Sequence, residues 1–137
     1  MQDTRDKPPA SLDFPLGLIE EFRASYALDV IWTAPRRGVR WCGRHNVVAQ
    51  LLREAAAMQA LVFTRLRRSC GEAQIIDEFV ARFTYGGEGI ENVHLPAGAD
   101  IELERVRILT LSDNQVTQET AIETWTVLGA RAPGLIP

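Results

Sequence analysis

Residues 26–58 decide the fold of this chain, and they read Tyr26-Ala-Leu-Asp-Val-Ile-Trp-Thr-Ala-Pro35, Arg36-Arg-Gly-Val-Arg-Trp-Cys-Gly43 and Arg44-His-Asn-Val-Val-Ala-Gln-Leu-Leu-Arg-Glu-Ala-Ala-Ala-Met58. The β-branched and aromatic run at 30–33 predicts a strand that ends at Pro35, because the residue before a proline avoids the helical region. Residues 39–42 predict a second, brief strand that is broken by Gly43. The segment from about 44 to 58 predicts a helix whose apolar side carries Val47, Val48, Leu51 and Leu52, and whose polar side carries Gln50, Arg53 and Glu54.

The residues on either side of this stretch predict a short helix and two tails. Residues 1–12 are charged and rich in proline, which is typical of a flexible tail. Asp13 is placed to cap a helix with Pro15 in its first turn, and helical spacing relates Leu18, Ile19, Phe22 and Tyr26. At the other end, residues 129–137 hold too many breakers for a regular element and predict a C-terminal tail.

Beyond the helix, the hydrophobic period changes to two, which indicates strands. We expect strands at 61–68, 74–85, 101–111 and 116–128, with a glycine-rich loop at 86–98 and a hairpin turn at 112–115. Helices followed by long antiparallel strands predict an α+β fold. The 137 residues suffice for a single domain, which we place at 13–128.

The composition excludes several classes of partner. Apolar residues make up 46% and charged residues 24% of the chain, as in a soluble globular protein, and the net charge is −3. Binding to nucleic acid needs a dense basic face, so no nucleic acid is expected as a partner. No apolar run reaches the roughly 20 residues that span a bilayer, and no signal peptide opens the chain, so we expect no membrane partner and a cytoplasmic location. The arginines of the turn at 36–40 are expected to be solvated.

The order of these elements resembles the nuclear transport factor 2-like superfamily, particularly its SnoaL-like and ketosteroid-isomerase-like branches. The resemblance covers residues 14–128, although the first helix is shorter than is usual in the family. It rests on Tyr26-x-x-Asp29-Val30 with the strand to Pro35, on Gly43 before the helix, on Leu95-Pro96-Ala97-Gly98 before the penultimate strand, and on the Asp113-Asn114 turn into Val116.

The resemblance implies a cystatin-like cone, in which a curved mixed or antiparallel sheet wraps around N-terminal helices and leaves a pocket at its open end. It also implies a homodimer that pairs through the sheet and a small hydrophobic ligand as a partner. The fold hosts isomerases, dehydratases, epoxide hydrolases, cyclases and non-enzymatic binders, so the fold does not supply the function.

The steroid isomerases that this chain resembles place a carboxylate base just before the proline that ends the first strand. Ala34 occupies this position, and an alanine cannot abstract a proton. Their second acid would fall near Val106 on the penultimate strand, and a valine cannot donate a hydrogen bond. Isomerase chemistry of that type is therefore disfavoured.

The candidate catalytic residues are three carboxylates, Asp77, Glu119 and Glu123. Alternation along the last strand places the two glutamates on one face, together with Ala121 and Trp125, and the resemblance directs this face to the pocket. The two glutamates are about 13 Å apart along the strand, and burial would raise their pKa values and make either a usable acid or base. The alternative is a bulge that reverses the face, so that both lie in water or pair with Arg105 or Arg107.

Asp77 alternates with apolar residues in the row Ile75-x-Asp77-x-Phe79-x-Ala81-x-Phe83. An acid on such a row is either buried or at the edge of the pocket, and a buried carboxylate needs a partner. Functional use and a structural pair with an arginine are therefore equal alternatives for Asp77.

The candidate ligand-binding residues are Tyr26, Trp32, Phe79, His94 and Trp125. Tyr26 could donate into the cavity, although a core tyrosine with a backbone partner is the more ordinary interpretation. The other aromatic residues would supply apolar wall, whether of a pocket or of the core. His94 lies in the glycine-rich loop, and binding residues are frequent in loops. Neither the spacing of a metal site nor a phosphate-binding loop occurs, so no metal and no cofactor are expected.

Three functions remain open at this point. The leading hypothesis is a domain that binds a small hydrophobic molecule and has an undetermined activity. The first alternative is an acid–base enzyme of the isomerase, cyclase, dehydratase or epoxide-hydrolase type, acting on a hydrophobic carbonyl or epoxide. The second alternative is a non-catalytic, dimeric interaction domain with a filled cone.

Overall fold

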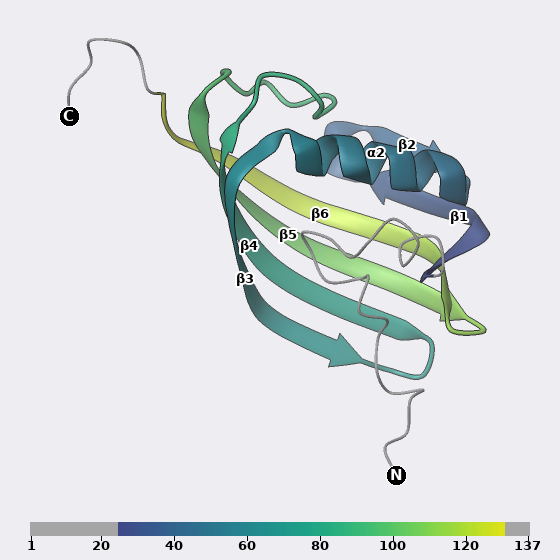
Figure 1. Ribbon diagram of the computed structural model, residues 1–137. Helices are drawn as coiled ribbons and strands as arrows, with labels where there is room; N and C mark the ends of the chain where they lie inside the picture. The colour runs from purple at the N-terminus through teal and green to yellow at the C-terminus, as the bar shows by residue number, and fades with distance from the viewer. Residues whose placement is uncertain (1–24, 131–137) are drawn as a thin grey trace.

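The computed structural model describes residues 25–130, which form one mixed sheet of six strands, one α-helix and one short 3-10 helix (Figure 1). The order of strands across the sheet is β2-β1-β6-β5-β4-β3. The elements in chain order are β1 (Tyr26–Ala34), η3 (Pro35–Arg37), β2 (Val39–Cys42), α2 (Arg44–Ala56), β3 (Met58–Cys70), β4 (Gln74–Tyr85), β5 (Ala99–Ser112) and β6 (Gln115–Ala130).

Two glycines allow the sharp changes of direction on either side of β2. Gly38 follows η3 with a φ of 66°, and its N–H donates to the carbonyl oxygen of Pro35 at 3.1 Å. Gly43 has a φ of 90° and donates to the carbonyl oxygen of Val30 at 2.8 Å, directly before α2 begins. Glycine adopts such positive φ values without a steric penalty. The proline and the two glycines therefore fix how β1, β2 and α2 follow one another.

The sheet is antiparallel except at one pair of neighbours. β1 runs parallel to β6, and the other neighbouring strands run antiparallel. The long strands β3 to β6 curve together, and α2 lies over the concave side near β1 and β2 (Figure 1). We call this concave side the inner face and the opposite, convex side the outer face.

Alternation along the strands separates an apolar inner face from a more polar outer face. In β4 and β5, the side chains of Phe79, Phe83, Ile101 and Leu103 are buried, whereas those of Glu102 and Glu104 on the outer face retain contact with water. One core cluster joins α2 to β1 and β2, and a second lies under the far ends of β4 and β5. This two-residue period is the one that the sequence predicts for half-buried strands.

The predicted strands and the helix predicted at 44–58 agree with the observed elements, but two expectations at the ends are wrong. Tyr26, predicted on a helix, is the first residue of β1, and residues 129 and 130, predicted in the tail, belong to β6. The strands expected at 39–42 and 74–85 have those bounds, and the other strands and the helix match with shifted ends. The tail predicted at 1–12 and most of the short helix predicted after it lie outside the described residues. Within residues 25–130, no helix is long and apolar enough to cross a membrane. The cytoplasmic location stays a prediction.

Candidate functional site

The inner face carries buried charged residues on three neighbouring strands. β4 contributes Asp77, β5 contributes Arg105 and Arg107, and β6 contributes Glu119 and Glu123. Each of these residues is at most 5% exposed, although charged side chains are rarely fully buried unless they are paired. The register places Arg105 opposite Glu123, and Arg107 opposite Asp77. The strand β6 therefore presents both glutamates to the inside, as the alternation predicts, and arginines face them from β5.

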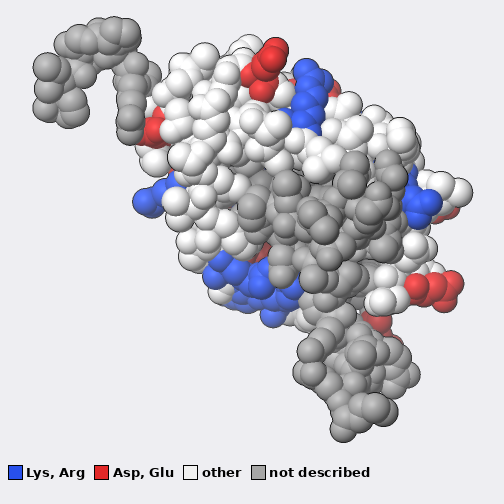
Figure 2. Space-filling view, in the orientation of Figure 1, with Lys and Arg blue, Asp and Glu red and all other residues white. Residues whose placement is uncertain are grey.

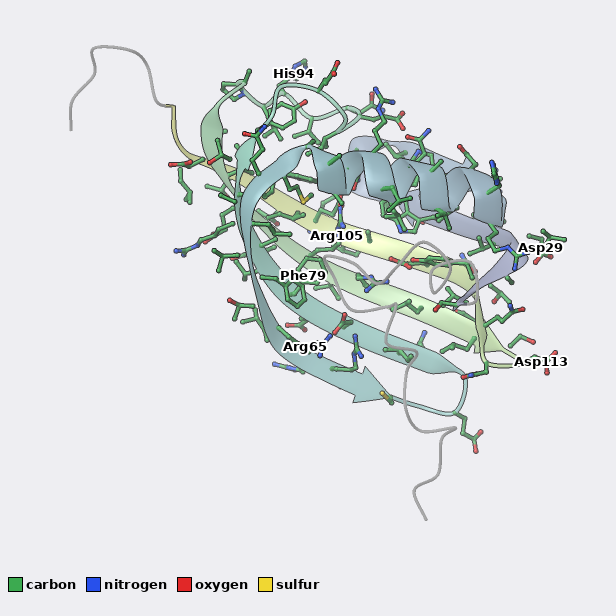
Figure 3. All side chains as sticks on the ribbon, viewed as in Figure 1. Asp29, Arg65, Phe79, His94, Arg105 and Asp113 are labelled. Atoms are coloured by element: carbon green, nitrogen blue, oxygen red, sulfur yellow. The ribbon has the colours of Figure 1, made fainter. Side chains whose placement is uncertain are left out.

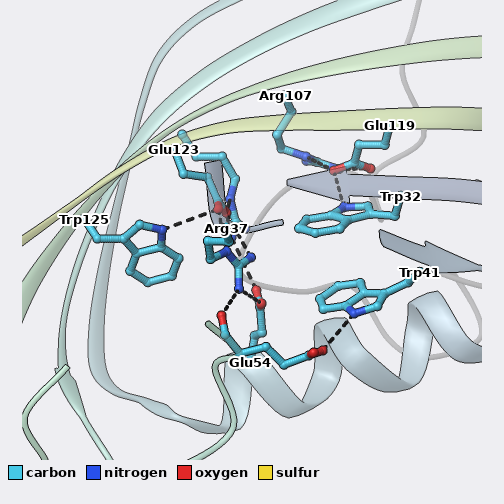
Figure 4. Close-up of polar contacts among 10 residues, drawn as sticks. Trp32, Arg37, Trp41, Glu54, Arg107, Glu119, Glu123 and Trp125 are labelled. Carbon is cyan, nitrogen blue, oxygen red and sulfur yellow. Dashed lines mark hydrogen bonds and ion pairs between the residues drawn. The ribbon is translucent and has the colours of Figure 1, made fainter. Parts of the chain in front are cut away.

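Four buried charges form what we call the closed ring, namely Arg37 of η3, Glu54 of α2, Arg105 of β5 and Glu123 of β6 (Figure 4). Arg37 donates from Nε to Glu123 Oε1 at 2.7 Å and from Nη1 to Glu54 Oε2 at 2.9 Å. Arg105 donates from Nε to Glu123 Oε2 at 2.8 Å and from Nη2 to Glu54 Oε1 at 3.3 Å. Cations and anions alternate around this ring, so each buried charge is compensated by two neighbours.

Aromatic rings lie against the guanidinium groups of the closed ring. The Cζ atom of Arg37 is 5.8 Å from the ring centroid of Trp32 and 5.3 Å from that of Trp125. The Cζ atom of Arg105 is 5.8 Å from the Trp32 ring and 5.9 Å from the Phe79 ring. Because aromatic faces attract cations, these contacts stabilise the two guanidinium groups beyond their ion pairs. The closed ring is therefore a fixed part of the inner face.

Glu119 is the centre of a second group, the Glu119 cluster, with Tyr26, Trp32 and Arg107. Its Oε1 atom accepts hydrogen bonds from the Tyr26 hydroxyl at 2.7 Å and from Arg107 Nη2 at 3.2 Å. Its Oε2 atom accepts from Trp32 Nε1 at 3.0 Å and from Arg107 Nε at 2.9 Å. A carboxylate has about four lone-pair sites. The carboxylate of Glu119 is therefore fully engaged.

The arginines lower the pKa of both glutamates. Burial by itself would raise the pKa of Glu119, but the charge and hydrogen bonds of Arg107, with the hydroxyl of Tyr26, outweigh burial and lower it. The pKa of Glu123 is lowered in the same way, since Arg105 and Arg37 outweigh the effect of burial. Burial acts in the expected direction, but the expectation that the two pKa values are raised is wrong, because the neighbouring charges decide the net direction.

The environment of Glu119 acts in the opposite direction on its tyrosine partner. Burial and the negative charge of Glu119 raise the pKa of Tyr26 well above its ordinary value. The hydroxyl of Tyr26 is therefore held in its protonated form, as a hydrogen-bond donor to Glu119.

Asp77 is the centre of a third group, the Asp77 cluster, with Arg65, Arg68 and Arg107. Arg68 binds the carboxylate through two contacts, Nε to Oδ1 at 3.2 Å and Nη2 to Oδ2 at 3.1 Å. Arg65 Nε lies 3.3 Å from Oδ1, and Arg107 Nη1 lies 3.6 Å from Oδ2. The side chain of Asp77 is 1% exposed, whereas those of Arg65 and Arg68 are 34% and 14% exposed. The carboxylate is thus inside, and two of its arginine partners reach the surface.

The candidate ligand-binding residues fall into three places. Tyr26 and Trp32 are fully buried in the Glu119 cluster, and Trp32 also stacks on Trp41 with ring centroids 4.3 Å apart. Phe79 and Trp125 lie near Arg105 of the closed ring, and Trp125 is only half-buried. His94 is exposed in the loop between β4 and β5, apart from the other four (Figure 3). Four of the five candidates therefore lie on the inner face, in two adjoining groups, and His94 lies outside it.

The loop between β4 and β5 is attached to the closed ring. Arg37 Nη1 donates to the carbonyl oxygen of Glu91 at 3.1 Å, and Asn92 Nδ2 donates to the carbonyl oxygen of Arg37 at 3.1 Å. The carboxylate of Glu91 also accepts from Trp41 Nε1 at 2.9 Å. These contacts tie the middle of the loop to η3 and β2.

Two members of the closed ring contradict the sequence-based expectations. Arg37, expected to be solvated, is 7% exposed, and Glu54, expected on the polar side of the helix, is 1% exposed. The apolar periodicity of α2 carries no signal for a buried carboxylate, so Glu54 could not be found from the helix alone. A signal for Arg105 and Arg107 does exist, since they continue the buried row Ile101-x-Leu103-x-Arg105-x-Arg107-x-Leu109.

The two positions that the resemblance assigns to the isomerase acids lie on β1 and β5. Ala34 is fully buried at the end of β1 and carries no ionisable group. Val106 is half-buried on the outer face. Its neighbours Arg105 and Arg107 point inward instead, and neither of them is an acid.

The part of the chain between residues 25 and 130 contains no group of three or more His, Cys, Asp or Glu side chains that could hold a metal ion. Within the same residues, no buried side-chain nitrogen or oxygen lacks a hydrogen-bond partner. The inner face is therefore a fully satisfied polar network with aromatic side chains around it.

No family model matches the sequence, and no curated protein matches it either. The structure is similar to a protein assigned as a SnoaL-like polyketide cyclase from Jannaschia sp. CCS1, with a TM-score of 0.65 and 14% identity over 78% of this chain and 72% of that chain. It is also similar to an LEH-like epoxide hydrolase from M. tuberculosis, with a TM-score of 0.57 and 12% identity over 77% and 70%.

A third similar structure is a steroid delta-isomerase from Pseudomonas aeruginosa, with a TM-score of 0.55 and 15% identity over 77% of this chain and 67% of that chain. Other similar structures are described as nuclear transport factor 2-like and as having a cystatin-like fold. At these identities the similarity concerns the fold alone. This chain has the cystatin-like fold that SnoaL-like, ketosteroid-isomerase-like and nuclear transport factor 2-like proteins share.

Proposed function

We propose that this protein binds a small hydrophobic molecule against the inner face of its sheet. The observation that carries the proposal is the set of aromatic side chains on this face, Phe63 of β3, Phe79 of β4 and Trp125 of β6. Phe63 and Trp125 are only half-buried, and the ring centroids of Phe63 and Phe79 are 4.9 Å apart. Ligand sites in proteins are lined mainly by such side chains, with a few fixed polar groups for orientation.

In this proposal the buried carboxylates hold arginines in position and do not transfer protons. Glu119 accepts four hydrogen bonds, and Glu123 is bound by both Arg37 and Arg105. A general base must reach a proton of the substrate and needs a pKa near the working pH. The lowered pKa values of both glutamates, and their occupied lone pairs, favour a structural role.

Binding can be measured by the thermal stability of the purified chain in the presence of apolar carbonyl compounds. A ligand that binds only the folded state raises the apparent stability by RT ln(1 + [L]/Kd), which is about 2.7 kcal/mol at 100 times Kd. We expect a saturable rise in Tm for at least one compound. A complete absence of saturable shifts across the panel would remove the proposal.

Two variants of β3 locate the binding site. Phe63→Ala removes an aromatic side chain from the inner face, and we expect it to weaken binding at least tenfold. Val62→Ala is the matched control, because the neighbouring side chain is 62% exposed and points to the outer face. Equal effects of the two substitutions on ligand affinity would contradict a site on the inner face.

The second candidate function is an acid–base enzyme that uses Asp77, Glu119 or Glu123. One observation favours it, namely the Tyr26 hydroxyl 2.7 Å from Glu119, which pairs a proton donor with a carboxylate. Such an enzyme requires turnover that Glu119→Gln and Tyr26→Phe each reduce by at least about a hundredfold, the usual contribution of general acid–base catalysis. If both variants keep the affinity and turnover of the wild type, Glu119 and Tyr26 have no part in catalysis.

The outer face supports the further proposal that two copies pair through their sheets. Val62, Leu66 and Leu128 are 62%, 60% and 52% exposed there, and apolar patches of this kind mark association surfaces. In analytical ultracentrifugation we expect the wild type to sediment as a dimer and the Leu66→Arg variant to sediment as a monomer. A monomeric wild type would contradict the pairing.

The shape of the whole domain is part of the same proposal. The concave sheet would wrap around α2 and the N-terminal helix predicted from the sequence, in a single domain that extends over 13–128. The curvature of β3 to β6 around α2 supports this arrangement.

A further inference from the structure

We propose that the ligand carries an acidic group, and that the Asp77 cluster recognises this group as a carboxylate. The inference rests on the proposed function, because it concerns the same inner face, and it adds the chemical class of the ligand. The expected partner is an amphipathic molecule with an apolar body and one carboxylate.

The geometry of the Asp77 cluster is that of a carboxylate receptor. Arg68 binds Asp77 through two parallel contacts of 3.2 and 3.1 Å, and Arg65 and Arg107 contact the same carboxylate. Planar guanidinium groups with a forked set of donors are the side chains best suited to bind carboxylates in two-point fashion. Within residues 25–130, the cluster already holds the carboxylate of Asp77, which belongs to the chain itself.

The cluster lies at the border between the protein interior and water. The side chains of Arg65 and Arg68 are 34% and 14% exposed, whereas the two arginines of the closed ring are at most 3% exposed. Basic side chains gather over the lower part of the sheet, where β3 runs and where Arg65 lies (Figures 2 and 3). A molecule from solution can therefore reach these guanidinium groups without opening the closed ring.

Aromatic side chains lie next to the cluster on the same two strands. Arg65 pairs in register with Phe79, and the ring of Phe79 lies 4.9 Å from that of Phe63. An apolar body would lie on these rings while its carboxylate reaches Arg65 and Arg68. The distance between head and body is then set by the two-residue period of β3, about 7 Å.

An incoming carboxylate would compete with Asp77 for the same guanidinium groups. Replacing one carboxylate by another keeps Arg65 and Arg68 compensated, and the displaced Asp77 keeps Arg107, whose Nη1 lies 3.6 Å from Oδ2, as a cation beside it. Removing the internal competitor should therefore strengthen binding of the external one. This competition separates a receptor for carboxylates from a cluster that serves only the fold.

The experiment is calorimetric titration of the full chain with three apolar carboxylates, octanoate, decanoate and naphthalene-2-carboxylate, each compared with its own primary amide. We expect at least one carboxylate to bind at least tenfold more tightly than its amide. Arg65→Gln and Arg68→Gln should each reduce this preference at least threefold. Asp77→Asn, which keeps the shape of the side chain, should raise the affinity for the carboxylate.

Arg67→Gln is the matched control, because it removes the same charge from an exposed residue of the same strand. It should leave the preference for carboxylate over amide unchanged. If Arg67→Gln lowers this preference as much as Arg65→Gln and Arg68→Gln do, the preference reflects only the net charge of the protein, and the inference is overturned. If the amides bind as well as the carboxylates, the inference is overturned and the proposed function stands. If none of the six compounds binds, both are overturned.

Discussion

The closed ring and the Asp77 cluster use the same pair of functional groups in different surroundings. In the closed ring, Arg37 and Arg105 are at most 3% exposed in their side chains, and each bridges the same two glutamates. In the Asp77 cluster, one buried carboxylate is bound by arginines of which two reach the surface. The two groups therefore differ in burial and not in residue type, and our proposal is that the more exposed one can exchange its partner.

The largest effect is expected from breaking the closed ring. Glu123→Gln keeps the shape but removes the charge that Arg37 and Arg105 share, and leaving a buried charge without its partner costs about 3–5 kcal/mol. Denaturation in urea should show this loss in the free energy of unfolding. Glu104→Gln, on an exposed residue of β5, is the control and should change the stability by less than about 0.5 kcal/mol.

Acid should reduce the contributions of the closed ring and of the Glu119 cluster to stability over the same range of pH. The pKa values of Glu119 and Glu123 are lowered in the folded state, so their contribution is complete above the unfolded pKa of about 4.3 and is lost as the pH falls through the folded values. Urea titrations between pH 7 and pH 3 should therefore show a stability that falls below about pH 4.5. In Glu123→Gln this dependence should be shallower. A stability that rises on acidification in this range would contradict the ion pairs.

A smaller loss is expected in the Asp77 cluster. Asp77→Asn should cost about 1.5–3 kcal/mol, the range for hydrogen bonds to charged groups, because Arg65 and Arg68 can turn toward water. The comparison with Glu123→Gln, measured under the same conditions, tests the contrast directly. Equal losses would mean that the exposed arginines are held as firmly as the buried ones.

The smallest effect is expected at an ion pair of the outer face. Arg82 contacts Glu102 at 2.8 Å, but its side chain is 64% exposed, and exposed pairs contribute about 0–1 kcal/mol. Arg82→Gln should therefore change the free energy of unfolding by less than about 0.5 kcal/mol, and high salt should remove the difference. A loss above about 2 kcal/mol would mean that the contribution of these ion pairs to stability does not depend on their burial in the way we describe.

The strands could be predicted from the sequence because each has a long, regular alternation. The elements β2 and β4 have the predicted bounds, and the alternation also places Asp77, Glu119 and Glu123 on the inner face. These are signals of local spacing, which one sequence carries by itself.

The closed ring could not be predicted, because it joins residues that are far apart in the chain. Arg37 looks like a turn residue and Glu54 like the polar side of a helix, and only the packing of η3 and α2 on the sheet buries them. The predicted direction of the Glu123 pKa shift was wrong for the same reason, because that direction depends on which arginines the fold places beside the carboxylate. Long-range charge pairing leaves no periodic trace in the sequence.

The account depends most on the state of the two buried glutamates, and carbon-13 NMR of labelled glutamate side chains reports that state directly. A pH titration of the folded chain should show that the carboxyl groups of Glu119 and Glu123 stay ionised down to a pH below about 4.3, the ordinary value for glutamate. Substitution of each residue by glutamine assigns its signal. A midpoint between about pH 6 and 7 for either group would reveal a tuned acid or base and would contradict a structural role.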